Sequence, residues 1–148
     1  MSFLPAYFDT SAIVKLVVIE PESDALVQAL ASWPDRVSSS VARVEVHRAL
    51  RRLGESRAAY ARADAVLAAL VLVRADEPVL AQAALFKDPQ LRALDAIHLA
   101  TAVTLGDDPD VFITYDARLA RAAARLRLRV VHPGADRLTG PRRRTRRD

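Results

Sequence analysis

Four acidic residues of this sequence could act together in chemistry: Asp9, Glu45, Asp95 and Asp116. Each lies at the end of a predicted strand or within a predicted apolar helix. Hard divalent cations such as Mg²⁺ and Mn²⁺ prefer oxygen ligands, and clustered carboxylates repel one another unless a cation neutralises them. If the four side chains converge, the sequence predicts a metal-dependent enzyme of phosphate chemistry.

The simplest interpretation treats each acid separately. Asp9 and Asp116 follow predicted strands and precede predicted helices, where Asp is a common N-cap. Glu45 could pair with Arg48 or Arg52 on a solvated helix face. What favours a shared site is the joint occurrence of two acids at strand ends and two in apolar helices.

Asp95 carries the strongest signal, because residues 94–100 are among the most apolar of the chain. A carboxylate rarely enters such surroundings without a partner. Asp95 could cap its helix or pair with Arg92, the nearest basic residue. A cation shared with the other three acids would also remove the cost of burying the charge.

The elements that must position these acids alternate between strands and helices. Strands are expected at residues 4–9, 36–39, 70–74, 111–115 and 128–131. Helices are expected from residue 10, over 24–32, 40–53 and 55–70, from residue 76, over 94–105 and from residue 116. This order predicts an α/β fold with a mostly parallel central sheet of 4–5 short strands flanked by helices. Since ligands bind at the carboxyl ends of parallel strands, Asp9 and Asp116 should share one edge.

Composition excludes several other kinds of site. The 148 residues contain no cysteine, which rules out disulfides, thiolate metal sites and cysteine nucleophiles. With three histidines and no cysteine, a structural zinc site is disfavoured. No apolar run reaches the length of a bilayer span and the first residues show no leader pattern, so we expect a cytoplasmic protein without membrane association.

Charge is unevenly distributed along the chain. The whole sequence carries a net charge of +4, but residues 137–148 hold six Arg and one Asp, which leaves residues 1–136 near neutral. We therefore expect one domain over residues 1–136 and a basic, Arg-rich tail over 137–148. The tail either contacts nucleic-acid phosphates or is simply solvated. A near-neutral body predicts that the site holds an anionic substrate through its cations rather than through lysines.

Four sequence blocks carry a specific resemblance. Residues 7–16 read YFDTSAIVKL, 40–45 read SVARVE, 91–100 read LRALDAIHLA and 112–116 read FITYD. In order and spacing these blocks resemble the PIN-domain ribonucleases, and most closely the toxins of VapBC-type toxin–antitoxin pairs. The resemblance covers about residues 4–133 and leaves out the basic tail.

The resemblance implies a role for each matched residue. Asp9, Glu45, Asp95 and Asp116 would bind Mg²⁺ or Mn²⁺ and support endonucleolytic cleavage of single-stranded RNA. Thr114 would help to orient the site. Thr10 and Ser11 would offer hydroxyls or helix N-terminal amides to a metal-bound water or a phosphate. His98 could act as a base, but its position favours packing beside its helix.

The same resemblance implies a cognate antitoxin as a partner and a homodimer. Two other interpretations stay open: a PIN-domain nuclease that processes RNA or cleaves DNA, and a non-catalytic binding module on the same fold. A phosphatase or receiver-type domain also places an Asp after its first strand, but needs a lysine late in the chain. Lys15 and Lys87 are the two lysines of this sequence, which argues against that class.

Overall fold

The computed structural model describes residues 5–105, 111–135 and 138. Its strands form one sheet in the order β3-β2-β1-β4-β5, and every pairing is parallel. The strands are β1 (Ala6–Phe8), β2 (Arg36–Ser39), β3 (Val71–Val73), β4 (Val111–Ile113) and β5 (Val130–Val131). The predicted α/β fold with a parallel sheet is confirmed, although most strands are shorter than expected.

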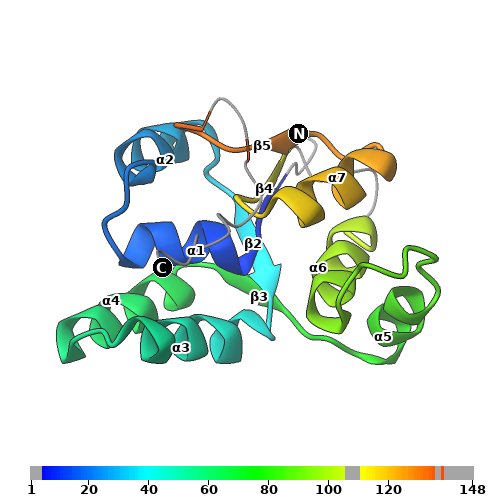
Figure 1. The fold of residues 1–148 in the computed structure, drawn as a ribbon, viewed down its shortest axis with the longest axis horizontal. Coiled ribbons are helices and arrows are strands. Elements are labelled where there is room, and N and C mark those ends of the chain that lie inside the picture. Colours follow the sequence, from blue (N-terminus) through cyan, green and yellow to red (C-terminus); the bar gives the residue numbers. More distant parts are fainter. Residues whose placement is uncertain (1–4, 106–110, 136–137, 139–148) are drawn as a thin grey trace, which may run out of the picture.

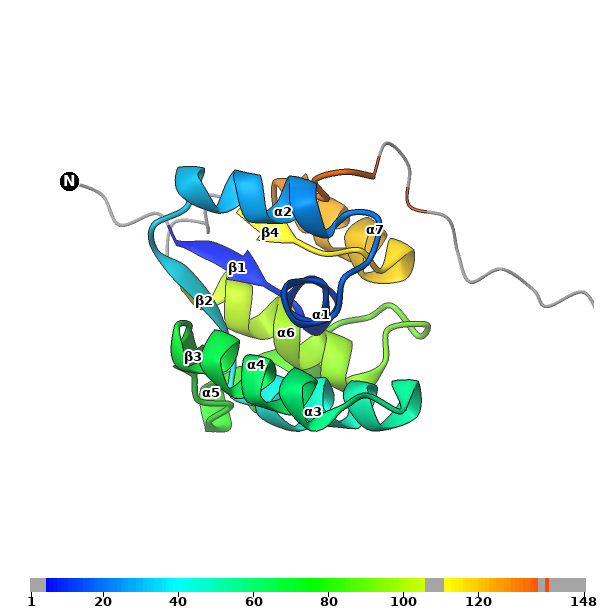
Figure 2. The same cartoon turned by 90° about the vertical axis from the view of Figure 1, so that its left-hand side faces the viewer.

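Helices cover both faces of this sheet (Figure 1). They are α1 (Thr10–Val17), α2 (Ser23–Ala29), α3 (Ala42–Leu53), α4 (Arg57–Ala68), α5 (Glu77–Ala84), α6 (Ala93–Val103) and α7 (Ala117–Arg125). Helices α1–α4 lie on one side, where α1 contacts α2, α3 and α4, and α5–α7 lie on the other (Figure 2). A 3₁₀ turn over Leu30–Ser32 completes the predicted helix at 24–32.

Alternating side chains of β1 divide the interior into two cores. Ala6 and Phe8 pack with α1–α4, whereas Tyr7 packs with residues of α6 and α7. The two-residue period of a strand sends neighbouring side chains to opposite faces, and a parallel sheet buried on both faces therefore needs apolar residues at every position. This explains why residues 6–8 and 111–113 are continuous apolar runs.

Capping residues and one glycine set the ends of the helices around the candidate site. Asp9 caps α1 and Asp116 caps α7, each through a carboxylate that accepts backbone amides. Gly54 ends α3 with a φ of 66°, a left-handed conformation that glycine adopts without steric cost. Gly106, which follows the helix expected over residues 94–105, and all of the basic tail except Leu138 lie outside the described residues. None of the helices in the described part of the chain combines the length and apolarity needed to cross a bilayer.

Candidate active site

Parallel pairing of β1 and β4 brings two of the four acids to one edge. Phe8 is in register with Ile113, and the Asp9 amide donates to the Ile113 carbonyl at 3.1 Å. The residues that follow both strands therefore emerge side by side, and the predicted placement of Asp9 and Asp116 at one edge is confirmed. Both acids cap helices as well, so the simple capping interpretation and the shared edge hold together.

Asp9 lies at the bottom of the site and is 3% exposed. Its Oδ1 accepts from the Ser11 hydroxyl at 2.7 Å and from the Ala12 amide at 2.9 Å. Its Oδ2 accepts from the Thr114 hydroxyl at 2.6 Å. Burial raises the pKa of Asp9, while the charge of His98 and these hydrogen bonds oppose the shift. Ser11 and Thr114 thus hold the carboxylate in place from two strand ends.

Glu45 turns toward the same edge from the first turn of α3. Its Oε1 accepts from the Thr10 hydroxyl at 3.0 Å and lies 2.7 Å from Nε2 of His98. The alternative in which Glu45 pairs with Arg48 or Arg52 on a solvated face is wrong, because the carboxylate is half-buried and these contacts point it inward.

His98 is the residue whose role the sequence did not reveal. It is 1% exposed, as packing would predict, but both ring nitrogens have polar partners. Nδ1 lies 2.7 Å from the hydroxyl of Tyr7, and Nε2 contacts Glu45. The three-residue spacing from Asp95 places His98 on the same helix face, but Tyr7 is 91 positions away, and no local pattern links the two.

Asp95 and Asp116 lie nearer the surface and are partly exposed. The pKa of Asp95 is raised to about 6, first by burial, then by the charge of Asp116, against an opposing contribution from His98. Asp9 and Glu45 raise it further. All three other acids therefore act on one carboxylate, which indicates that the fold brings the four together. Of the two simpler roles weighed for Asp95, an ion pair with Arg92 is not formed, and α6 has no side-chain cap.

The carboxylate oxygens of the four acids are suitable ligands for a hard divalent cation. Carboxylate oxygens are the preferred ligands of Mg²⁺ and Mn²⁺, and a cation would relieve the repulsion that raises the pKa of Asp95. Within the described residues, however, no three His, Asp or Glu side chains stand in a ready-made ligand arrangement. Asp9 and Glu45 accept hydrogen bonds, but a carboxylate has about four lone-pair sites, so both still have lone pairs to offer an ion.

An open groove of about 1310 Å³ lies above the acids. Glu45, Asp95, Asp116, Thr10 and Ser11 contribute to its lining. Its walls also carry five arginines: Arg48, Arg52, Arg92, Arg118 and Arg121. The expectation concerned lysines, and neither lysine lines the groove; the arginines are cationic side chains that it did not consider. The near-neutral average concealed a segregation of charge, and the spacings of four and three residues between these arginines were the signal that could have revealed it.

Comparison with known proteins identifies the family of this chain. A family model described as PIN domain matches residues 6–125. The chain belongs to the PIN-domain family. Among similar PIN-domain proteins of Mycobacterium tuberculosis (strain ATCC 25618 / H37Rv), "Ribonuclease VapC46" is 52% identical over 128 residues, 86% of this chain and 96% of that protein. "Ribonuclease VapC35" is 43% identical over 136 residues, with the same coverage. The resemblance to VapC-type PIN domains is confirmed.

Two solved structures of toxins share the architecture. M. tuberculosis VapC20, described as a Sarcin-Ricin loop cleaving toxin, superposes with a TM-score of 0.66 at 20% identity, over 79% of this chain and 94% of that one. At this identity the likeness concerns the fold alone. A toxin–antitoxin complex from Klebsiella pneumoniae gives a TM-score of 0.58 at 25% identity, over 76% of this chain and 88% of that one.

Proposed function

We propose that this protein is a Mg²⁺- or Mn²⁺-dependent endoribonuclease that hydrolyses single-stranded RNA as the toxin of a toxin–antitoxin pair. The observation that carries this proposal is that four carboxylates lie together at one edge of a PIN-domain sheet. Burial and the charges of the other three acids raise the pKa of Asp95. The similarity to proteins named ribonucleases supports RNA as the substrate.

The four acids divide into three that would hold the cation and one, Glu45, with a separate role. Asp9, Asp95 and Asp116 would hold the cation, with Asp9 fixed by Ser11 and Thr114. A cation bound there supplies an activated water and neutralises charge on the attacked phosphodiester. Glu45, held by Thr10, either completes the ligand set or accepts a proton from the attacking water. No protein nucleophile is needed, in keeping with a chain that lacks cysteine.

The groove walls support an anionic, extended substrate. Arg48 and Arg52 stand one helical turn apart on α3, and Arg92 precedes α6. Arginine binds phosphate through two parallel N–H···O bonds and remains charged at any physiological pH. A strand laid along the groove would meet these side chains on either side of the acids.

The proposal also includes an antitoxin partner and a homodimer. Val44 and Leu94 line the groove and are 65% and 45% exposed. An antitoxin segment with apolar side chains and one arginine would cover these residues and place a cation among the acids. We expect the toxin to work as a homodimer in the cytoplasm, where its RNA substrates occur; its mass in solution, free and with antitoxin, tests the assembly.

A cleavage assay tests the central claim. Wild-type protein should cut single-stranded RNA only when Mg²⁺ or Mn²⁺ is added, and Mn²⁺ should raise its melting temperature. Asp9→Asn should lose both responses while keeping the helical circular dichroism of the wild type. Metal-independent cutting, or full activity of Asp9→Asn, would refute the mechanism; cleavage of single-stranded DNA alone would favour the DNA-cleaving alternative.

A further inference from the structure

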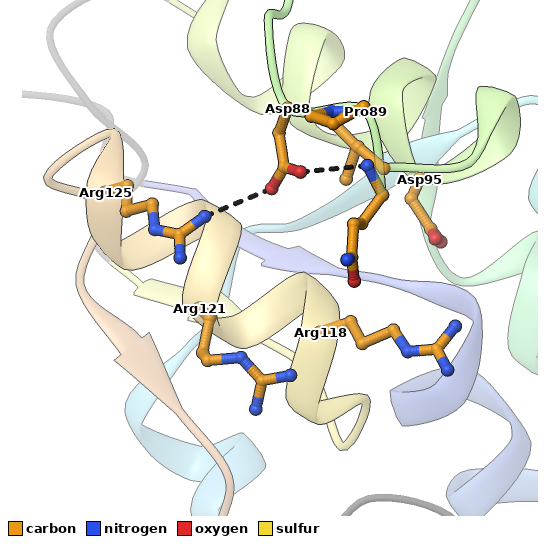
Figure 3. Close-up of a pocket in the computed structure, with 8 residues that line it drawn as sticks. Asp88, Pro89, Asp95, Arg118, Arg121 and Arg125 are labelled. Carbon is orange, nitrogen blue, oxygen red and sulfur yellow. Dashed lines mark hydrogen bonds and ion pairs between the residues drawn. The ribbon is translucent and has the colours of Figure 1, made fainter.

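A second, smaller pocket adjoins the groove, between α7 and the segment before α6 (Figure 3). Its volume is about 340 Å³. It is lined by Asp88, Pro89, Gln90, Leu91, Asp95, Arg118, Arg121 and Arg125. Asp95, Arg118 and Arg121 line the groove as well, so the pocket opens directly beside the acids. Its position makes it a continuation of the site rather than a separate cavity.

Three arginines of α7 form one wall of this pocket. Arg118, Arg121 and Arg125 recur at spacings of three and four residues, which places them on one face of the helix. The opposite face packs into the core through Leu119, Ala122 and Ala123. Packing therefore fixes the rotation of α7, and with it the direction in which the arginines project (Figure 3).

Two of the three arginines of this wall form no ion pair within the described residues. Within the described residues the guanidinium groups of Arg118 and Arg121 form no ion pair, and Arg125 alone contacts an acid, Asp88, at 3.2 Å. Asp88 is itself anchored, because it accepts the backbone amide of Gln90 at 3.0 Å. Neighbouring cations that form no ion pair, such as Arg118 and Arg121, raise the local potential and attract anions.

We propose that this pocket binds the backbone phosphates of the RNA on one side of the scissile bond. The inference rests on the proposed function and adds a subsite to it. The arginines from Arg118 to Arg125 extend over about 10 Å of helix, enough for a strand to contact more than one of them. The Arg125–Asp88 pair limits the available charge, so its loss should strengthen binding. An anionic protein segment is the competing ligand, and the test separates the two.

Binding of a labelled single-stranded RNA, measured in EDTA so that cleavage cannot interfere, tests the subsite. Arg118→Gln/Arg121→Gln should weaken binding several-fold and lower the slope of log K against log salt by about 0.7 for each lost contact. Asp88→Asn should tighten binding. Arg57→Gln, an exposed change outside both pockets, is the matched control and should behave as wild type.

Two results would overturn the subsite. One is an unchanged affinity and salt slope in the double variant. The other is retained RNA binding with loss of antitoxin binding, which would assign the wall to a protein partner. Failure of the proposed function looks different, because wild-type protein would then bind RNA through α7 and cleave none.

A separate observation concerns the buried chain Tyr7–His98–Glu45. Tyr7 and His98 are essentially inaccessible, and the Tyr7 ring is held by stacking on Phe112 at 5.2 Å. Glu45 also accepts a hydrogen bond from Thr10, so its oxygen acts as an acceptor toward Nε2 of His98. Nε2 must carry a proton to donate to this oxygen, and Nδ1 lies 2.7 Å from the Tyr7 hydroxyl. Burial raises the pKa of Tyr7, so its hydroxyl stays protonated beside Nδ1.

We infer that His98 is a positioning residue that orients Glu45, and that Tyr7 holds the imidazole ring in place. This inference also rests on the proposed function, but its first test does not involve cleavage. Nitrogen NMR of metal-free protein should show a proton on Nε2 of His98, as the contact with Glu45 requires. An unprotonated Nε2 would overturn the inference.

Substitutions provide the second test. His98→Leu should lower kcat about tenfold or more with little change in KM for RNA, as for residues that support a metal ligand. His98→Gln, whose amide can still donate to Glu45, should recover part of the loss. Tyr7→Phe keeps the ring stacking and should give an intermediate kcat. Full kcat in His98→Leu, with unchanged folding, would contradict the positioning role.

Discussion

The floor and the walls of the groove are built in opposite ways. At the floor, Asp9 is buried and accepts three hydrogen bonds, two from residues of α1 and one from Thr114, which follows β4. On the walls, arginines such as Arg52 and Arg121 stand exposed on single helices. The floor is therefore stiff and depends on distant parts of the chain, whereas the walls are adaptable and depend on local helical spacing.

This difference predicts which property a substitution at the floor or on the walls should change. Removing a partner from a buried, hydrogen-bonded group leaves an unsatisfied polar atom and costs stability as well as function. Exposed side chains away from such networks change the free energy of unfolding by about 0.5 kcal/mol or less. We therefore expect floor variants to alter chemistry and folding, and wall variants to alter substrate binding alone.

The largest effect should come from Asp9→Asn. The substitution keeps the shape and the N-cap but removes a charge from the cation site. Cleavage should fall more than about 100-fold, beyond the range for residues that only support a metal ligand. RNA cleavage rates with saturating Mn²⁺ measure the loss, and Asp24→Asn, an exposed acid on α2, is the matched control.

Thr114→Val should come next. Its hydroxyl donates to Asp9 at 2.6 Å and accepts the Asp116 amide at 3.1 Å, so the change disturbs two acids at once. We expect a loss of about 1–3 kcal/mol in the free energy of unfolding and about tenfold or more in cleavage. Urea denaturation and kinetics check both values. Thr114→Ser retains the hydroxyl and should stay near wild type; equal damage by Ser would argue that the methyl group, not the hydroxyl, matters.

Asp95 should make metal-free stability depend on pH. Its pKa rises from 3.8 to about 6 on folding, so between these values the folded state holds a proton that the unfolded state has released. Stability should therefore fall as pH rises through this window and remain lower above it. Asp95→Asn should remove the dependence and be more stable at pH 7 by about 1–2 kcal/mol, after allowance for solvent screening.

Thermal denaturation in EDTA at pH 4 and pH 8 measures this difference between wild type and Asp95→Asn. Added Mn²⁺ should restore stability to the wild type at pH 8, since a cation offsets the repulsion that destabilises the ionised carboxylate. A wild type that becomes more stable from pH 4 to pH 8 by the same amount as Asp95→Asn would contradict the raised pKa.

The smallest effect should come from the α3 wall. Arg52→Gln should raise KM for RNA a few-fold, leave kcat unchanged and shift the free energy of unfolding by no more than about 0.5 kcal/mol. The increase in KM should shrink at high salt, where phosphate contacts are already weakened. A fall in kcat with unchanged KM would place Arg52 in the chemistry and break the distinction between floor and walls.

Much of the candidate site could be predicted from local patterns. The apolar run at 111–113 followed by Asp116, and the apolar helix around Asp95, identified the acids because such residues are unusual in those settings. The helix expected over residues 40–53 ends where α3 ends, and β2 was predicted with its observed limits. These features depend on a few neighbouring residues, which is why the sequence was sufficient.

Contacts between distant residues were decided by the tertiary structure. The sequence by itself determined the elements, the acids and the arginine spacings. Only the fold set the strand order, turned Glu45 inward, joined Tyr7 to His98 and gathered arginines of α3, α6 and α7 around one groove. The physical reason is that helical spacing and capping act within a turn of chain, whereas pairing across a sheet and packing between helices depend on which surfaces meet.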